Sequence, residues 1–335
     1  MSPGRGGSPE TSGGAQVYCL SMPSLTDIRA AAMRIAPHVH RTPVVTSRTL
    51  DREVGARVFF KCENLQKVGA FKARGATNAV LSLDDDVAER GVVTHSSGNH
   101  AAALAYAASI RGLRCTVVMP ETAPAIKVEA VRGYGAEIVF CTQSEREAVC
   151  ERVVEQTGAT LVHPFDDERI IAGQGTAALE LLEEVRDLDA IVAPVGGGGL
   201  LAGTAIVMKS LRPQGIVFGA EPRAVDDAYR SLESGIRQPG VKDPKTIADG
   251  LLTGIGKLNF EILRERRARI VTVSEEAIVA AARYHLERLK LVVEPSAAVG
   301  LAAVREIVPD IHGMKVGVII SGGNTDFSWL PRSVF

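Results

Sequence analysis

Between residues 90 and 165, hydrophobic positions form short β-branched runs that are separated by longer stretches with helical periodicity. The short runs predict strands, at residues 92–95, 115–119, 137–141 and 160–163. The longer stretches predict helices, at residues 98–111, 124–134 and 145–156, the last behind a capping box of Ser144 and Glu147. This alternation predicts a parallel sheet with helices on both of its faces.

The same alternation resumes near residue 190. It predicts strands at 190–195, 215–220, 270–273 and 315–321, and helices near 200–211, 275–290 and 295–308. Closer to the N-terminus, Ser24 and Asp27 open a helix, and the strands at 44–46 and 58–61 have no partner nearby in sequence. We therefore expect an α/β fold with two lobes, each an open twisted parallel sheet, and the N-terminal strands should join the second sheet.

Composition narrows the class of protein. With 335 residues, the chain has room for about two domains. Its hydrophobic fraction of 46% and net charge of -1 indicate a soluble globular protein with no basic surface for nucleic acid and no membrane partner. The five cysteines lack CxxC spacing, which favours reduced thiols in the cytoplasm. Residues 1–22, rich in Gly, Ser and Pro, are typical of a disordered tail.

Lys72 is the first candidate for chemistry. It lies in the stretch 69–76 (Gly-Ala-Phe-Lys-Ala-Arg-Gly-Ala), between a predicted strand and a helix-forming run, so its amine is expected to face a cleft. A lysine attacks an aldehyde only when burial or neighbouring charge lowers its pKa. Because most loop lysines are solvated surface groups, this pattern alone does not decide its role.

Four consecutive glycines, Gly196, Gly197, Gly198 and Gly199, stand between a predicted strand and a predicted helix. Their amides can converge without obstruction by Cβ atoms, and the helix N-terminus adds a positive dipole, so this turn is a candidate phosphate site. A purely structural turn is the alternative. The spacing Gly-x-Gly-x-x-Ala also fits a dinucleotide site, with Glu221 for the ribose, which leaves a nicotinamide enzyme open.

Two more polar turns follow predicted strands, at 96–100 (Ser-Ser-Gly-Asn-His) and at 321–324 (Ser-Gly-Gly-Asn). The first could hold a carboxylate at a helix N-terminus, although an ordinary helix cap also explains it. All three turns lie at the C-terminal ends of parallel strands, where open α/β sheets bind ligands. A dinucleotide explains only one turn, whereas a phosphate-bearing aldehyde joined to Lys72 as an imine uses all of these elements.

These motifs, together with the stretch 172–176 (Ala-Gly-Gln-Gly-Thr), resemble those of pyridoxal-phosphate enzymes of the tryptophan synthase β fold (fold type II). Within that fold the chain is most similar to the family of serine racemases and serine/threonine dehydratases. The resemblance implies a large cofactor-binding domain, 23–87 plus 167–335, and a small mobile domain, 88–166. It also implies a small amino-acid substrate and a homodimer.

The resemblance implies roles at the cofactor pyridoxal 5'-phosphate. Lys72 would form the imine and then act as the base at Cα. The amides of the four glycines and of Leu200 would hold the phosphate, and Phe71 would pack against the pyridine ring. Asn99 would bond the phenolic oxygen and Ser321 the ring nitrogen. A serine hydroxyl provides no charge for a protonated ring, which favours β-elimination and disfavours transamination.

Racemisation requires a proton donor and acceptor on each face of the substrate. Lys72 serves one face, and the resemblance assigns the other to Ser97, a position at which many threonine dehydratases carry alanine. Ser96, Asn99 and His100, together with Ser97, would surround the substrate carboxylate. The alternative is that Ser97 merely caps a helix.

Two further sites are implied by the resemblance. Glu221, Asp227 and the carbonyl of Val225 would bind Mg²⁺ (or Ca²⁺ or Mn²⁺), which reassigns Glu221 from a ribose to a cation that braces the large lobe. Animal-type relatives bind ATP at a subunit interface, and the residues that match this site are Lys67, Lys127, Tyr134 and Asn324. The residues that do not match are Arg48, Val68 and Ala102, so the sequence supports ATP activation only in part.

We therefore expect a cytoplasmic pyridoxal-phosphate enzyme that interconverts L- and D-serine and also dehydrates serine to pyruvate and ammonia. The first alternative is an ammonia-lyase of L-threonine, L-serine or hydroxyaspartate without significant racemisation. The remaining alternatives are an NAD-dependent oxidoreductase and a non-catalytic binding protein on the same fold.

Overall fold

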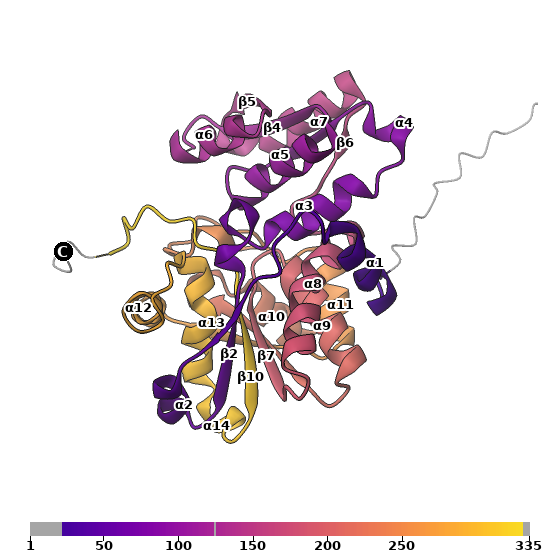
Figure 1. The fold of residues 1–335 in the computed structure, drawn as a ribbon. Coiled ribbons are helices and arrows are strands. Elements are labelled where there is room, and N and C mark those ends of the chain that lie inside the picture. The colour runs from indigo at the N-terminus through magenta and orange to yellow at the C-terminus, as the bar shows by residue number, and fades with distance from the viewer. Residues whose placement is uncertain (1–21, 124, 331–335) are drawn as a thin grey trace, which may run out of the picture.

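The structure, a computed structural model, describes residues 22–123 and 125–330. This part of the chain forms two lobes, each built on its own sheet (Figure 1). The smaller lobe lies above the larger one in that view, and helix α3 (Lys72–Leu81) lies between them. The predicted tail, 1–22, lies outside the described residues except for Met22.

The small lobe contains four parallel strands in the order β5-β4-β3-β6. The strands are β3 (Val92–His95), β4 (Cys115–Pro120), β5 (Glu137–Cys141) and β6 (Thr160–Leu161). The helices are α4 (Asp85–Ala88), α5 (Asn99–Arg111), α6 (Ala125–Gly133), the 3-10 helix η3 (Gln143–Glu145) and α7 (Arg146–Thr157). The predicted alternation of strands and helices is confirmed in this lobe.

The large sheet has the strand order β1-β2-β10-β7-β8-β9. The strands are β1 (Val44–Thr46), β2 (Arg57–Cys62), β7 (Ala190–Pro194), β8 (Ile216–Pro222), β9 (Arg269–Val273) and β10 (Lys315–Ile320). The two N-terminal strands join this sheet, as predicted, but β1 pairs antiparallel with β2 and so forms an edge that is not parallel. The last strand of the chain, β10, lies between β2 and β7.

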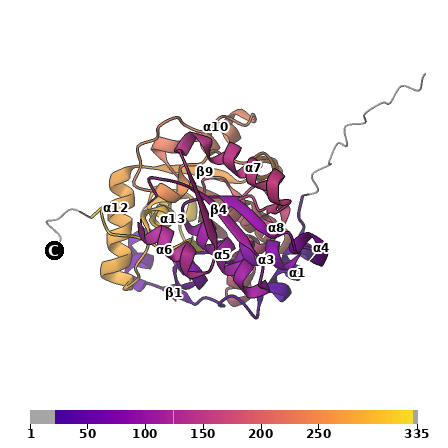
Figure 2. The same ribbon diagram turned by 90° about the horizontal axis from the view of Figure 1, so that it is seen from above.

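Helices cover both faces of the large sheet. The α-helices of this lobe are α1 (Leu25–Ile35), α2 (Arg48–Val54), α8 (Glu168–Glu184), α9 (Gly199–Leu211), α10 (Asp227–Ser234), α11 (Lys257–Glu265), α12 (Glu275–Tyr284), α13 (Pro295–Glu306) and α14 (Val308–Ile311). The short helices are η1 (Glu63–Leu65), η2 (Lys67–Gly69), η4 (Arg223–Val225), η5 (Asp249–Leu251) and the π-helix η6 (His285–Leu289). Viewed from above, α5 and β4 lie over the middle of the molecule and α12 runs along one side (Figure 2). No described helix combines the length and hydrophobicity needed to traverse a lipid bilayer.

The helices differ from the sequence predictions in several places, and α2, α4, α10, α11 and α14 were not predicted. The capping box at Ser144 is wrong, because α7 begins at Arg146 and Ser144 lies in the preceding 3-10 turn. The helix predicted at 275–290 changes to π geometry after Tyr284. Helix α8 was not predicted, because residues 170–179 are buried without interruption and lack the polar face that gives a helix its periodic pattern.

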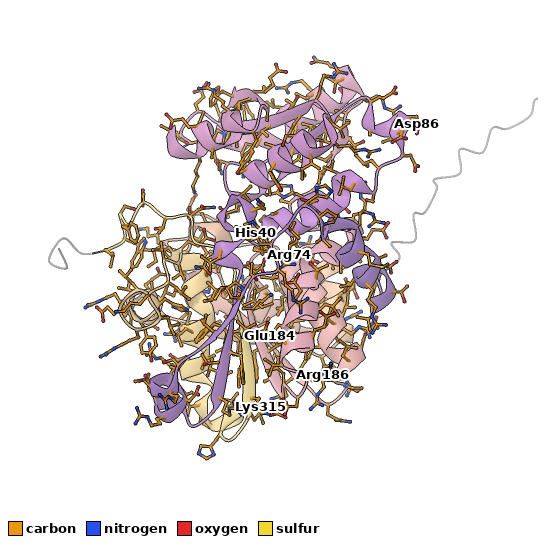
Figure 3. The ribbon with its side chains drawn as sticks, viewed as in Figure 1. His40, Arg74, Asp86, Glu184, Arg186 and Lys315 are labelled. Carbon is orange, nitrogen blue, oxygen red and sulfur yellow. The ribbon has the colours of Figure 1, made fainter. Side chains whose placement is uncertain are left out.

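A buried ion-pair network fixes the start of α3. Arg74, which is 0% exposed, donates to both carboxylate oxygens of Glu63 at 2.7 and 2.8 Å and to both of Glu180 at 2.7 and 2.9 Å. Lys61, also fully buried, donates to Glu180 at 2.6 Å. Figure 3 shows Arg74 near the middle of the molecule, close to His40, whose carbonyl accepts another of its hydrogen bonds at 3.2 Å. Two cations and two carboxylates therefore join β2, η1, α3 and α8.

We expect Arg74→Met to lower the free energy of unfolding by about 3–5 kcal/mol, because it leaves the negative charges of Glu63 and Glu180 in the core with only Lys61 to balance them. Urea denaturation followed by circular dichroism measures this loss. The control is Arg41→Met, which breaks an ion pair to Glu183 whose side chains are 56% and 51% exposed. It should change stability by less than about 1 kcal/mol. Equal losses in the two variants would contradict the anchoring role of Arg74.

Candidate active site

The C-terminal ends of β2, β10 and β7 meet at one edge of the large sheet, because these strands are parallel neighbours. The chain before Lys72 is joined to the chain after β10. Ala70 forms an isolated β-bridge with Gly322, and the Phe71 amide donates to the carbonyl of Ser321 at 2.9 Å. The glycine turn follows β7. The strand order therefore places the lysine, the glycines and Ser321 at the same sheet edge.

Lys72 is the first residue of α3 and is half-buried. Its amine donates to the carbonyl of Pro164 at 2.6 Å and lies 5.2 Å from the centroid of the Phe71 ring. Burial lowers the pKa of Lys72 to about 8, although the carboxylate of Glu294 acts in the opposite direction. A substantial neutral fraction near neutral pH makes this amine a competent nucleophile.

The glycine turn presents backbone amides that are not used within the protein. Helix α9 begins at Gly199, and no side chain caps it. Among the described residues, no acceptor is bonded to the amides of residues 196–200. Gly198 has a φ of +94°, and a Cβ on Gly197 would lie 2.2 Å from the Phe165 ring, so side chains are excluded here. Five free amides at a helix N-terminus fit a phosphate group.

The turn at 96–100 leads from β3 into α5. The N-cap of α5 is Gly98 and no described side chain caps the helix, so the interpretation of Ser97 as a capping residue is wrong. The Ser97 hydroxyl is half-buried and bonds to no described residue, whereas the Ser96 hydroxyl accepts from the Gly98 amide at 3.4 Å. The side chain of Asn99 donates to Glu294 and accepts from Asn324 at 2.9 Å, so it links this turn to the large lobe.

His100 lies deeper than the other residues of its turn. It is 2% exposed, and its Nε2 lies 3.1 Å from the carbonyl of Val162. Burial, followed by the positive charge of Lys72, holds the pKa of His100 well below its usual value, so the ring is neutral. Its Nδ1 is buried and has no partner among the described residues. His100 can therefore offer a ligand only this second ring nitrogen.

Ser321 and Glu294 complete the site. Ser321 is buried, and its hydroxyl has no hydrogen-bond partner among the described residues. Glu294, which the sequence could not assign to a role, is 5% exposed and accepts from Asn99 Nδ2 at 3.0 Å through each carboxylate oxygen. Burial raises the pKa of Glu294 to about 7. The apolar residues 291–293 before it gave an indirect indication that this acid is buried.

The predicted metal ligands are buried together near the start of α10. Glu221 is 1% exposed, and its two oxygens accept from the amides of Ala228 and Tyr229, both at 2.9 Å. Asp227 is 3% exposed and accepts from the Ile255 amide at 2.8 Å. Burial and nearby acids raise the pKa of both carboxyl groups, that of Glu221 to about 8. Within residues 22–123 and 125–330, no group of three His, Cys, Asp or Glu side chains is placed to bind a metal.

A cavity of about 790 Å³ adjoins the site between the lobes. Three of the four residues that match a nucleotide site line it: Lys127, Tyr134 and Asn324. The fourth, Lys67, is not part of the lining, although the next residue, Val68, is. Lys127 donates to Asp249 at 2.7 Å, and this ion pair joins α6 of the small lobe to η5 of the large lobe.

A lysine of lowered pKa beside free backbone amides, on paired α/β lobes, defines a class: enzymes that hold an anionic aldehyde cofactor through an imine. The family model described as pyridoxal-phosphate dependent enzyme matches residues 35–322. The chain belongs to this family, and its fold is fold type II of the pyridoxal-phosphate enzymes. The predicted fold and the predicted pyridoxal phosphate are confirmed, and the nicotinamide alternative is wrong.

Three similar proteins show how closely the chain resembles known enzymes. Serine racemase of Dictyostelium discoideum is 50% identical over 314 residues, covering 92% of this chain and 97% of that protein. The beta-hydroxyaspartate dehydratase of Paracoccus denitrificans (strain Pd 1222) is 48% identical over 314 residues, covering 92% and 99%. The crystal structure of a T.th. threonine deaminase has a TM-score of 0.87 at 49% identity, covering 91% of this chain and 100% of that chain.

We expect the rate at which the apoprotein attaches pyridoxal phosphate to rise with pH and to level off above pH 8, because only the neutral amine of Lys72 attacks the aldehyde. Stopped-flow absorbance measures this rate. Glu294→Gln should move the inflection to lower pH, since the Glu294 carboxylate raises the pKa of Lys72. An inflection near the ordinary lysine value of about 10.4, or a shift to higher pH in the variant, would contradict this electrostatic account.

Proposed function

We propose that the protein interconverts L- and D-serine and also eliminates water from serine, giving pyruvate and ammonia. The observation that carries this proposal is the hydroxyl of Ser97, which is half-buried beside the start of α5 and bonds to no described residue. A capping serine would direct its oxygen at a backbone amide, whereas a free hydroxyl can exchange a proton with a ligand. The similarity to serine racemases supports the same function.

The cofactor would occupy the sheet edge. The free amides of the glycine turn and of Leu200 would hold its phosphate, and Phe71 would pack against its ring. The hydroxyl of Ser321 would meet the ring nitrogen, and the side chain of Asn99 would reach the phenolic oxygen. When bound, pyridoxal phosphate withdraws electrons from Cα of an amino acid joined to its aldehyde carbon. The carboxylate of Glu294, whose two oxygens lie at equal distances from Asn99 Nδ2, would share one of its hydrogens and leave the other for the phenolic oxygen.

The protein's own residues would then move the protons. The neutral amine of Lys72 would take the Cα proton of L-serine on one face. The hydroxyl of Ser97 would deliver a proton on the opposite face, and the reverse reaction would use the same groups with their roles exchanged. Elimination would require only Lys72 as the base and a proton for the departing hydroxyl. The Ser96 hydroxyl would donate to the substrate carboxylate. The Nδ1 of His100 can only accept, because Nε2 of the neutral ring donates to the Val162 carbonyl, so it would accept from the hydroxyl of the substrate serine.

A second function, elimination of ammonia from hydroxyaspartate, threonine or serine without racemisation, is supported by the similarity to beta-hydroxyaspartate dehydratase and threonine deaminase. Both functions would share Lys72 and the phosphate site. They differ in whether Ser97 takes part in proton transfer, so the chirality of the product separates them.

Incubation of the purified enzyme with L-serine should give D-serine together with pyruvate, as measured by chiral chromatography. Ser97→Ala should lower the rate of racemisation by about 100-fold or more while elimination from L-serine continues, because the variant lacks the second proton carrier. Ser109→Ala is the control and should keep both products, because Ser109 lies near the far end of α5 and its hydroxyl donates to the carbonyl of Tyr106 at 2.7 Å. Pyruvate without any D-serine would instead support the dehydratase, and equal loss of both reactions in Ser97→Ala would remove its proposed role.

We propose that Glu221, Asp227 and the carbonyl of Val225 bind Mg²⁺, with Ca²⁺ or Mn²⁺ as other hard cations of the same preference. The raised pKa values support this proposal, because two neighbouring carboxyl groups are buried without a cation close enough to reverse the effect of burial. The amides at the start of α10 hold Glu221 in place and leave further lone pairs on its oxygens. The ion would stabilise the large lobe and take no part in the chemistry.

Addition of Mg²⁺ at about 100 times its dissociation constant should stabilise the folded protein by about 2.7 kcal/mol, and a chelator should remove this gain. Differential scanning calorimetry measures the shift in Tm. Asp227→Asn should abolish the response to Mg²⁺. Asp226→Asn, which alters an acid paired with Arg230, is the control and should retain the response. A Tm that does not depend on Mg²⁺ in the wild type would argue against the site.

We also propose that residues 88–166 move as a unit against 23–87 plus 167–335 and that substrate binding closes the lobes. The cavity is a poor fit for ATP. Lys127 is already paired with Asp249, and the cavity lining includes the apolar side chains of Val68 and Ala102. A homodimer and a cytoplasmic location remain predictions from the sequence.

A further inference from the structure

Asn259, in the first turn of α11, holds the glycine turn through its side-chain amide. Its Nδ2 donates to the carbonyl of Gly197 at 2.7 Å and to the carbonyl of Phe165 at 3.0 Å. The residue is 0% exposed, and its Oδ1 has no hydrogen-bond partner among the described residues. Burying an unpaired amide oxygen lowers stability, and the two hydrogen bonds made by the NH₂ group offset this loss.

These contacts fix the plane of one peptide group. The carbonyl of Gly197 also accepts from the Gly256 amide at 3.0 Å, so two donors hold it on the side of α11. The described peptide bonds include no cis bond, and in a trans peptide the N–H points opposite to the C=O. The Gly198 amide therefore points away from α11, and no described acceptor is bonded to it.

We propose that Asn259 is a positioning residue that orients the Gly197–Gly198 peptide so that the Gly198 amide donates to the phosphate of the cofactor. This inference rests on the proposed role of the glycine turn as the phosphate site. Without the Asn259 amide, the carbonyl of Gly197 would keep only the Gly256 donor, and this flexible glycine peptide could rotate its N–H away from the ligand.

Asn259 is itself held by the connection between β6 and α8. The carboxylate of Asp166 accepts from the amides of Lys257, Leu258 and Asn259 at 2.9, 3.0 and 3.3 Å, which fixes the start of α11. The preceding residues of this connection supply the Pro164 carbonyl to the Lys72 amine and the Phe165 carbonyl to Asn259. One short segment therefore touches both the amine and the residue that orients the phosphate-binding peptide.

A positioning role and a merely structural role predict different results with two ligands. Pyridoxal phosphate and pyridoxal carry the same aldehyde, but pyridoxal lacks the phosphate. A defect in folding would lower the affinity for both ligands alike, since both attach to Lys72. A misoriented Gly198 amide would lower the affinity only for the phosphorylated ligand.

The experiment titrates the apoproteins of the wild type and of Asn259→Leu, a substitution of similar shape, with each ligand and follows the absorbance of the lysine-bound ring. We expect the affinity of Asn259→Leu for pyridoxal phosphate to fall about tenfold, as for the loss of a well-made hydrogen bond, with no change for pyridoxal. Inorganic phosphate should also compete less effectively with pyridoxal phosphate for the variant. Asn259→Ala tests the same point if the leucine variant does not fold.

The matched control is Asn78→Leu. Asn78 is also a buried asparagine whose Nδ2 donates to a backbone carbonyl, that of Arg169 at 2.7 Å, but it lies in α3 and its hydrogen bonds do not involve the glycine turn. This variant should lose thermal stability and keep the wild-type ratio of the two affinities. An unchanged ratio in Asn259→Leu would overturn the role of Asn259 alone. A wild-type protein in which phosphate adds nothing to affinity would overturn the proposed phosphate site as well.

Discussion

The ion-pair network around Arg74 is the constraint on which the active site depends. It joins the guanidinium to Glu63 and Glu180 in the core, and Lys61 balances the second carboxylate. Because Arg74 lies in the first turn of α3, the network also fixes the position of Lys72 two residues earlier. Lys61 donates to the carboxylate of Glu180, whereas Lys72 donates to the carbonyl of Pro164. Lys61 and Lys72 therefore differ in environment. An acid balances the charge of Lys61 in the core, whereas burial lowers the pKa of Lys72, as a nucleophilic amine requires.

The order of strands in the large sheet brings the segments of the candidate site together. Strand β10 is the last in the sequence, yet it lies between β2 and β7, so its terminal turn meets the approach to Lys72 on one side and the glycine turn on the other. The bridge between Ala70 and Gly322 and the bond from Phe71 to Ser321 join these segments directly. The position of β10 therefore places Ser321 between the approach to Lys72 and the free amides of the glycine turn.

The candidate site presents mainly neutral groups rather than charged side chains. The amides of the glycine turn are free of described acceptors, the hydroxyls of Ser97 and Ser321 have no partner among the described residues, and the imidazole of His100 is held neutral by burial. The carboxyl group of Glu294 has a pKa raised to about 7, so it too carries less than its full charge near neutral pH. An environment of this kind leaves the amine of Lys72 as the principal base, which suits the removal and return of a proton at carbon.

The sequence by itself determined the alternation of strands and helices, the turns at strand ends and the family, and it singled out Lys72 as a candidate, because each of these is written in contiguous residues. It did not predict α8, whose burial on all sides removes the periodic pattern of a helix. The roles of Glu294, Asn259 and the Pro164 carbonyl were decided only by the tertiary structure. Their partners lie far along the chain, 195 residues apart for Asn99 and Glu294 and 92 for Lys72 and Pro164. Such contacts depend on how the two lobes and the sheet order bring distant segments together, and they leave no local pattern in the sequence.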